Sequence, residues 1–204
     1  MNTSIKGIIA ILRGISPDQV LDVADILIGE GITCMEIPMN SPRVFESLEL
    51  LCKEKSDVAQ IGAGTVTSKD QLNQTIQTGA SFVVSPNTNA DLIAYAVEQK
   101  IRPLPGVFTI SEAFEAMQAG AQDLKLFPAH ILGPTIIKDW RSVLPKNIGI
   151  FPVGGIDASN FADFAQQDIQ GVGLGSSLYH PSFELSQIKE QGKKFVQMSQ
   201  GLFS

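Results

Sequence analysis

Short apolar runs and amphipathic segments alternate along this chain. The apolar runs predict strands at residues 7–13, 34–39, 59–65, 82–86, 101–107, 123–128, 148–154 and 171–176. Between them, apolar residues recur three and four positions apart, which predicts helices at 17–30, 42–55, 68–78, 89–99, 110–119, 134–144, 157–167 and 183–198. Ser16-Pro17 marks one helix start, and Gly31 and Gly79 mark helix ends.

The repeated strand–helix order predicts an α/β fold. Eight such units in 204 residues fit a compact (β/α)8 (TIM) barrel, a single domain over residues 1–204. An open doubly wound sheet has the same alternation and is the competing prediction. The polar residues favour the barrel, because they fall at the carboxyl ends of different strands. Those ends converge on one mouth in a barrel but spread along an edge in an open sheet.

Composition restricts the class of partner. Hydrophobic residues make up 44% of the chain and charged residues 18%, as in a globular domain. A net charge of −6 and a pI near 4.9 argue against nucleic acid as a partner. No apolar run approaches the ~18 residues of a membrane span, and residues 1–6 lack the layout of a signal peptide. Cys34 and Cys52 are expected to be free thiols, so a cytoplasmic protein without membrane attachment is predicted.

Lys125 lies inside the apolar strand predicted at 123–128, where a lysine is uncommon. The pKa of a free lysine is about 10.4, and an apolar site lowers that pKa and makes a neutral, nucleophilic amine abundant. The alternative interpretation is an edge-strand lysine whose ammonium reaches water. The other lysines lie at element ends or on polar helical faces.

Glu36 is a carboxylate inside a second apolar strand. Burial raises the pKa of a carboxyl group and suits it to proton transfer near neutrality. Its alternative role is that of an ion-pair partner for Arg13 or Lys125. A lysine amine and a carboxylate that meet in one barrel mouth are the minimum set for Schiff-base chemistry on a carbonyl substrate.

Glycine-rich strand ends predict a site for an anionic ligand. Residues 62–65 would let a ligand approach the backbone closely, and Thr65 offers a hydroxyl and an N–H group. A glycine pair at 154–155 and a Gly-Ser-Ser run at 175–177 follow the last two strands. In (β/α)8 barrels those two loops often bind phosphate, although tight turns also need glycine. Arg13 closes the first strand, next to the last one around a barrel, and could supply positive charge.

The motifs together resemble one enzyme family. Glu-Ile-Pro-Met-Asn-Ser-Pro at 36–42, Gly-Ala-Gly-Thr-Val at 62–66 and Lys-Leu-Phe-Pro at 125–128 resemble the class I 2-keto-3-deoxy-6-phosphogluconate and -galactonate aldolases, as do residues 9–14, 153–155 and 173–176. The resemblance covers essentially the whole chain. It implies a (β/α)8 barrel that assembles as a homotrimer and uses no metal or other cofactor. It also implies reversible cleavage of a six-carbon phosphorylated keto sugar acid to pyruvate and glyceraldehyde 3-phosphate.

The same resemblance implies roles for individual residues. Lys125 matches the Schiff-base lysine and Glu36 the general acid and base. Thr65 matches a substrate-binding threonine at the carboxylate end. Arg13 matches a substrate-binding arginine whose contact, with carboxylate or with phosphate, stays open. The implied ligands of the phosphate are Gly155, Gly175 and Ser176.

The choice between the two branches rests on two positions. The gluconate-type enzymes usually carry an arginine where this chain has Asn40, and a threonine where it has Val153. The sequence at 37–42 resembles the galactonate branch, so the galactonate substrate is expected, with its gluconate epimer at C4 as the alternative.

Two other classes of function compete with an aldolase. A sugar-phosphate epimerase or isomerase could use the same barrel, phosphate loops and Glu/Lys pair without a covalent intermediate. A non-catalytic phosphosugar-binding barrel is disfavoured, because burying both a lysine and a glutamate is costly without a use. His130 and His180 lack the sequence spacing of metal ligands, so no metal site is predicted.

Overall fold

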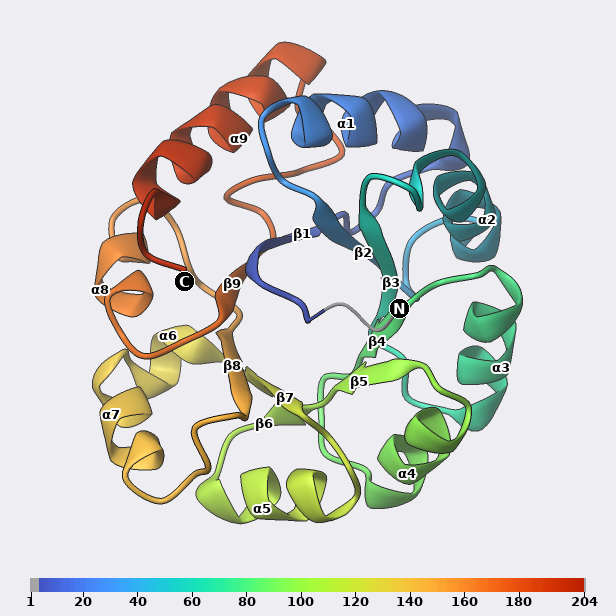
Figure 1. Ribbon diagram of the computed structural model, residues 1–204. Helices are drawn as coiled ribbons and strands as arrows, with labels where there is room; N and C mark the ends of the chain where they lie inside the picture. The colour runs from blue at the N-terminus through green and yellow to red at the C-terminus, as the bar shows by residue number, and fades with distance from the viewer. Residues whose placement is uncertain (1–3, 204) are drawn as a thin grey trace.

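The computed structural model describes residues 4–203, which form an α/β fold with the strands around the centre and the helices outside them (Figure 1). The strands are β1 (Gly7–Ile11), β2 (Cys34–Pro38), β3 (Gln60–Gly64), β4 (Phe82–Val84), β5 (Arg102–Leu104), β6 (Gly106–Val107), β7 (Asp123–Leu126), β8 (Gly149–Pro152) and β9 (Gly171–Leu174). The helices are α1 (Pro17–Gly29), α2 (Val44–Lys55), α3 (Lys69–Gln77), α4 (Ala90–Glu98), α5 (Ile110–Gln118), α6 (Ala129–Leu132), α7 (Thr135–Arg141), α8 (Phe161–Ala165) and α9 (Leu185–Ser199).

The strands pair in parallel throughout two sheets. One has six strands in the order β5-β4-β3-β2-β1-β9, and the other has three in the order β6-β7-β8. An isolated parallel bridge between Val153 and Gly173 links the end of β8 to β9. At the other junction, β5 and β6 are consecutive and separated by Pro105. The predicted α/β fold with parallel strands is confirmed.

Side chains on the two faces of the strands enter two different apolar clusters. The larger cluster joins the strands to the helices and contains Met35, Ile37, Leu124 and Leu126. The smaller cluster consists of Ile5, Ile9, Cys34, Phe82, Val84, Leu104 and Phe151. Because successive side chains of a strand point to opposite faces, residues that alternate with the first set lie on the inner face. Glu36 and Lys125 are in that inner set.

Three predicted elements differ from those observed. The strand predicted at 101–107 is interrupted at Pro105, which has no N–H group to donate to a ladder, although its carbonyl accepts the Lys125 N–H at 2.8 Å. The short helix α6 precedes α7, in a segment where the sequence predicts only a turn. The helix predicted at 157–167 is reduced to the five residues of α8.

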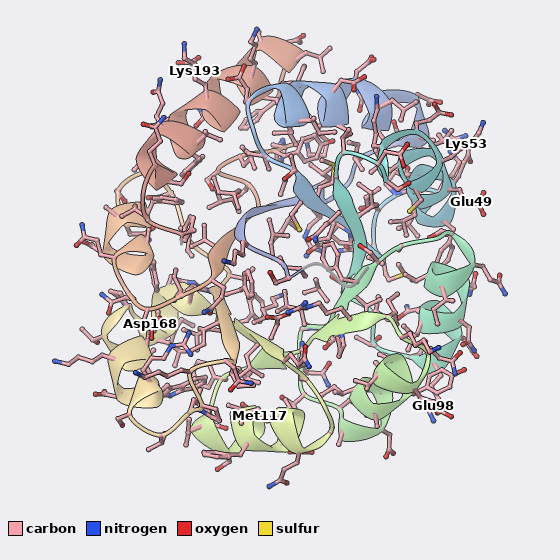
Figure 2. The ribbon with its side chains drawn as sticks, in the orientation of Figure 1. Glu49, Lys53, Glu98, Met117, Asp168 and Lys193 are labelled. Atoms are coloured by element: carbon pink, nitrogen blue, oxygen red, sulfur yellow. The ribbon has the colours of Figure 1, made fainter. Side chains whose placement is uncertain are left out.

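Charged side chains gather on the outer helices. Figure 2 shows Glu49 and Lys53 of α2 and Lys193 of α9 at the rim of the molecule, away from the strands. Cys34 and Cys52 are free and buried. Among residues 4–203, no helix is both long and apolar enough to cross a membrane.

Candidate active site

The carboxyl ends of the strands surround one cavity of about 490 Å³. Its lining includes every site residue that the sequence predicts: Arg13, Glu36, Thr65, Lys125, Gly155, Gly175 and Ser176. These residues come from β2, from β7 and from the segments that follow β1, β3, β8 and β9. The fold therefore brings together chemically reactive and glycine-rich positions that are far apart in the sequence.

Glu36 is 2% exposed and extends from the inner face of β2. Burial raises the pKa of its carboxyl group to about 7, against the opposing effect of the positive charges on Lys125 and Arg13. Within residues 4–203, its Oε2 atom has no hydrogen-bond partner. A buried carboxylate oxygen without a partner is unusual in proteins and is available to a ligand.

Lys125 is 6% exposed and lies in β7, the middle strand of its sheet. The alternative of an edge-strand lysine that reaches water is therefore wrong. Burial lowers the pKa of Lys125; the Glu36 carboxylate opposes this effect and the positive charge of Arg13 adds to it. The Nζ atom lies 4.4 Å from the centre of the Phe127 ring. In the part of the chain that the structure describes, no ion pair within 4.0 Å joins Lys125 to Glu36.

The glycines of β3 make room for neighbouring side chains. A Cβ atom on Gly64 would lie 1.8 Å from Glu36 Oε2, and a Cβ atom on Gly62 would lie 2.5 Å from the Phe82 ring. The expectation that these glycines admit a ligand to the backbone is therefore wrong for both positions. They instead allow the Glu36 carboxylate and the Phe82 ring to lie against β3.

Thr65 follows β3 with a φ angle of 58°, in the left-handed region that β-branched residues seldom adopt. Its neighbours fix this conformation, because Gly64 O accepts the Met39 N–H at 2.8 Å and Val66 N donates to Val84 O at 3.0 Å. Strained backbone of this kind clusters at functional sites. Thr65 lines the cavity beside Glu36 and Lys125.

The loops after β8 and β9 supply backbone donors. Leu178 and Tyr179 both donate to Gly175 O at 2.9 Å, which forms a single helical turn. Within residues 4–203, the preceding N–H groups of Ser176 and Ser177 have no acceptor, and neither has that of Gly155. Ser177 Oγ donates to Ile156 O at 2.8 Å and ties the two loops together. Free N–H groups in such an arrangement suit an anion.

Arg13 is exposed at the mouth of the cavity. Its Nη1 donates to Asn40 Oδ1 at 2.5 Å. The sequence motifs place Asn40 beside Glu36 but do not reveal this contact, because the two partners are 27 residues apart. Ser177, the last residue of the predicted phosphate-binding run, also lines the cavity, as does Asp157, which the sequence motifs do not identify as a site residue. The Asp157 carboxylate accepts the Ser159 N–H and hydroxyl, which lower its pKa.

Metal-ligating side chains do not cluster here. Among the described residues, no group of three or more His, Cys, Asp or Glu side chains could hold a metal ion. His130 Nδ1 lies 3.3 Å from Gly154 O, and His180 Nδ1 lies 2.7 Å from Ser182 Oγ, so each imidazole has a local partner.

The family model for KDPG and KHG aldolase matches residues 3–192. The chain belongs to this family. A probable 2-dehydro-3-deoxy-6-phosphogalactonate aldolase of Rhizobium meliloti is 42% identical over 91% of the chain and 88% of its own length. A 2-dehydro-3-deoxy-6-phosphogalactonate aldolase of Escherichia coli is 39% identical over 93% and 92%. A solved structure described as native KDPGal superposes with a TM-score of 0.93 at 38% identity, over 96% of this chain and 95% of that one.

Proposed function

We propose that this aldolase family member is a class I enzyme that reversibly cleaves 2-dehydro-3-deoxy-6-phospho-D-galactonate to pyruvate and D-glyceraldehyde 3-phosphate. The observation that carries the proposal is the pairing of a buried lysine with a buried, unpartnered carboxylate in one cavity. Burial makes the lysine easier to deprotonate and the carboxyl group harder to ionise. A neutral amine and a group that exchanges protons near pH 7 are what imine chemistry needs.

The reaction follows from these two groups. The Lys125 amine attacks the C2 carbonyl carbon, and loss of water gives a protonated imine. Glu36 takes the proton of the C4 hydroxyl, the C3–C4 bond breaks, and its electrons enter the imine to form an enamine. C4 leaves as the aldehyde carbon of glyceraldehyde 3-phosphate. Glu36 returns the proton to C3, and water releases pyruvate from Lys125.

The remaining predicted residues hold the two ends of the substrate. Gly155, Gly175 and Ser176 bind the phosphate, which is supported by the free N–H groups of Gly155 and Ser176 and by the turn that starts at Gly175. Thr65 binds at the carboxylate end, near the reacting lysine. Binding energy from the distant phosphate orients C2 toward the Lys125 amine.

The galactonate substrate is preferred to its gluconate epimer. Asn40 and Val153 stand where gluconate-type enzymes usually carry arginine and threonine. The names of the two relatives matched over about nine tenths of this chain support the same choice. The scheme needs no cofactor, because the protonated imine formed on Lys125 is itself the electron sink.

The whole chain is proposed to form one closed (β/α)8 barrel. This inference is supported by the Val153–Gly173 bridge between β8 and β9, by the continuity of β5 and β6 through Pro105, and by the two apolar clusters on opposite faces of the strands. Residues 1–3 and 204 of this domain lie outside the described residues. The family resemblance further supports assembly as a homotrimer, and the free thiols support a cytoplasmic location.

Trapping of the imine tests the proposal. Treatment with pyruvate and borohydride should leave one reduced three-carbon adduct per chain, on the peptide that contains Lys125, and Lys125→Met should take up none. Peptide mass spectrometry locates the adduct. An epimerase or isomerase would stay unmodified, and modification at another lysine would contradict the assignment. Pyruvate release from both C4 epimers then ranks the two substrates.

A further inference from the structure

Arg13 differs from the other arginines in its partner. The chain has four arginines. Arg43 pairs with Asp18 and Glu46, Arg102 pairs with Asp123, and Arg141 pairs with Asp168. Among residues 4–203, Arg13 has no carboxylate partner and donates instead to the neutral amide of Asn40. The positive charge at the cavity mouth is therefore not offset by a carboxylate bonded to it.

The segment that carries Asn40 is tied to both neighbouring strands. Met39 N donates to Gly64 O at 2.8 Å, at the end of β3. Gly14 N, next to Arg13, donates to Ser41 Oγ at 2.9 Å, and Ser41 N donates to Pro38 O at 2.9 Å. Asn40 thus sits between two anchored residues, which fixes its amide oxygen relative to the end of β1.

The direction of the contact decides which end of a substrate Arg13 serves. β1 lies between β2 and β9 in the sheet. Asn40 follows β2, whereas Gly175 and Ser176 follow β9, so the hydrogen bond draws Arg13 toward Glu36 and away from the phosphate loops. Arg13 also acts electrostatically on both Glu36 and Lys125. The substrate carboxylate is bonded to C2, the atom that Lys125 attacks, so it must lie in this region.

We infer that Asn40 is a positioning residue, which holds the Arg13 guanidinium toward β2 for the carboxylate of the keto acid without cancelling its charge. The inference rests on the proposed aldolase function and deepens it. Asn40 itself is exposed and is not among the described residues that line the cavity, so it acts through Arg13. An amide oxygen suits this role, because an aspartate here would orient Arg13 equally well but neutralise it.

Pyruvate is the probe that isolates this contact, since it has the carboxylate and the ketone but no phosphate. The concentration of pyruvate needed for half-maximal borohydride trapping should rise about tenfold in Asn40→Ala, the worth of one charge-assisted hydrogen bond. Asn40→Asp should weaken the binding of pyruvate further. It should also raise the pH midpoint of trapping, because the added negative charge stabilises the Lys125 ammonium.

A double-mutant cycle separates positioning from a structural role. In an Arg13→Ala background, Asn40→Ala should not change the pyruvate concentration needed for half-maximal trapping any further. The matched control is Asn73→Ala, which removes a comparable exposed hydrogen bond from Tyr95 on the outer helices and should leave trapping unchanged. Additive effects of the two substitutions, normal trapping in Asn40→Ala, or a loss seen only with the phosphorylated substrate would overturn the inference. Failure of the wild-type chain to form any adduct at Lys125 would instead reject the proposed function.

Discussion

Glu36 and Lys125 each bury an ionisable group, and among residues 4–203 neither forms a close ion pair that would offset the cost of desolvation. Arg102 and Asp123 show the contrasting case, since the buried Asp123 carboxylate is joined to the partly buried Arg102 by a direct hydrogen bond. The difference fits the proposed roles, because a carboxylate bonded to a cation would be a poor proton acceptor, and a lysine bonded to a carboxylate would stay an ammonium, which cannot attack a carbonyl carbon. Both groups line the cavity in which the substrate is proposed to bind.

Glu36→Gln tests the proton-transfer role. The variant keeps the shape of the side chain but cannot accept the C4 proton, so cleavage and exchange of the pyruvate methyl protons should fall by roughly 10²–10⁴. Trapping of pyruvate on Lys125 should persist, because the loss of the anion makes the amine easier to deprotonate. Proton exchange followed by NMR is the measurement. Exchange at the wild-type rate would show that Glu36 is only a charge partner.

The raised pKa of Glu36 also predicts how the stability of the wild type and of Glu36→Gln should differ with pH. The pKa of Glu36 is about 7 in the folded chain and 4.5 for a free side chain. The folded state binds this proton more tightly, so the stability that Glu36 contributes is full below pH 4.5 and is lost as the pH rises through 7. Glutamine does not ionise. Denaturant unfolding measures the free energy of unfolding of both proteins. Relative to the wild type, that of the variant should rise by on the order of 3 kcal/mol between pH 4.5 and 8. A constant difference across this range would contradict the raised pKa.

At the scale of elements, β2 and β3 together build the site proposed for the acid–base group. Glu36 pairs with Gly62 in the register of these strands, and its carboxylate lies over Gly64. The absence of a side chain at Gly64 is thus as necessary to the site as the presence of one at position 36.

Gly64→Ala should displace the Glu36 carboxylate. The new methyl group would occupy the position of Oε2, so kcat/KM should fall by at least about 10²-fold, the worth of the displaced acid–base group. The free energy of unfolding should fall by about 1–3 kcal/mol from overpacking. Steady-state kinetics and thermal unfolding measure the two effects.

Gly29→Ala is the matched control for this substitution. Gly29 lies in α1, and a Cβ atom there would meet no described heavy atom within 4 Å. The control should keep full activity, and its free energy of unfolding should rise by about 0.5–1 kcal/mol, because alanine is a better helix former than glycine. Wild-type activity in Gly64→Ala would refute the steric argument.

Much of this architecture is predictable from local pattern. The alternation of apolar and polar positions predicts a strand at each observed strand, and it identifies Glu36 and Lys125 as exceptions within apolar runs. Contacts between distant segments are not predictable in this way. The Arg13–Asn40 hydrogen bond and the fit of Glu36 over Gly64 depend on which strands are neighbours and in what register. The short helix α6 has only four residues, too few to show a helical period in the sequence. Its presence depends on the path that the chain takes after β7.

At the scale of the whole molecule, an acidic chain is proposed to bind an anionic substrate. With a net charge of −6, attraction must come from local groups. Arg13 and the free N–H groups of the last two loops supply it within one cavity, while charged residues such as Glu49, Lys53 and Lys193 lie on the outer helices (Figure 2). In the proposed site, backbone donors hold the phosphate end of the substrate, and a backbone N–H group carries no side-chain charge that a substitution could remove.

Removal of the phosphate from the substrate tests this arrangement. The dephosphorylated analogue should lose at least about 10²-fold in kcat/KM, the equivalent of two charge-assisted hydrogen bonds. Inorganic phosphate should inhibit turnover of the phosphorylated substrate competitively and should spare the pyruvate trapping reaction. Equal specificity constants for the two substrates would refute the assignment of Gly155, Gly175 and Ser176.

The division of strand side chains between two faces also bears on how such an enzyme acquires new substrates. Ile11 and Val153 are 8% and 5% exposed and line the cavity, yet they are in neither apolar cluster of the described residues. Substitutions there reshape the space around the ligand without opening a void in the packing that holds helices to strands. We therefore expect substrate specificity to be separable from folding in this chain, so that an evolving lineage or a library screen could alter one while conserving the other.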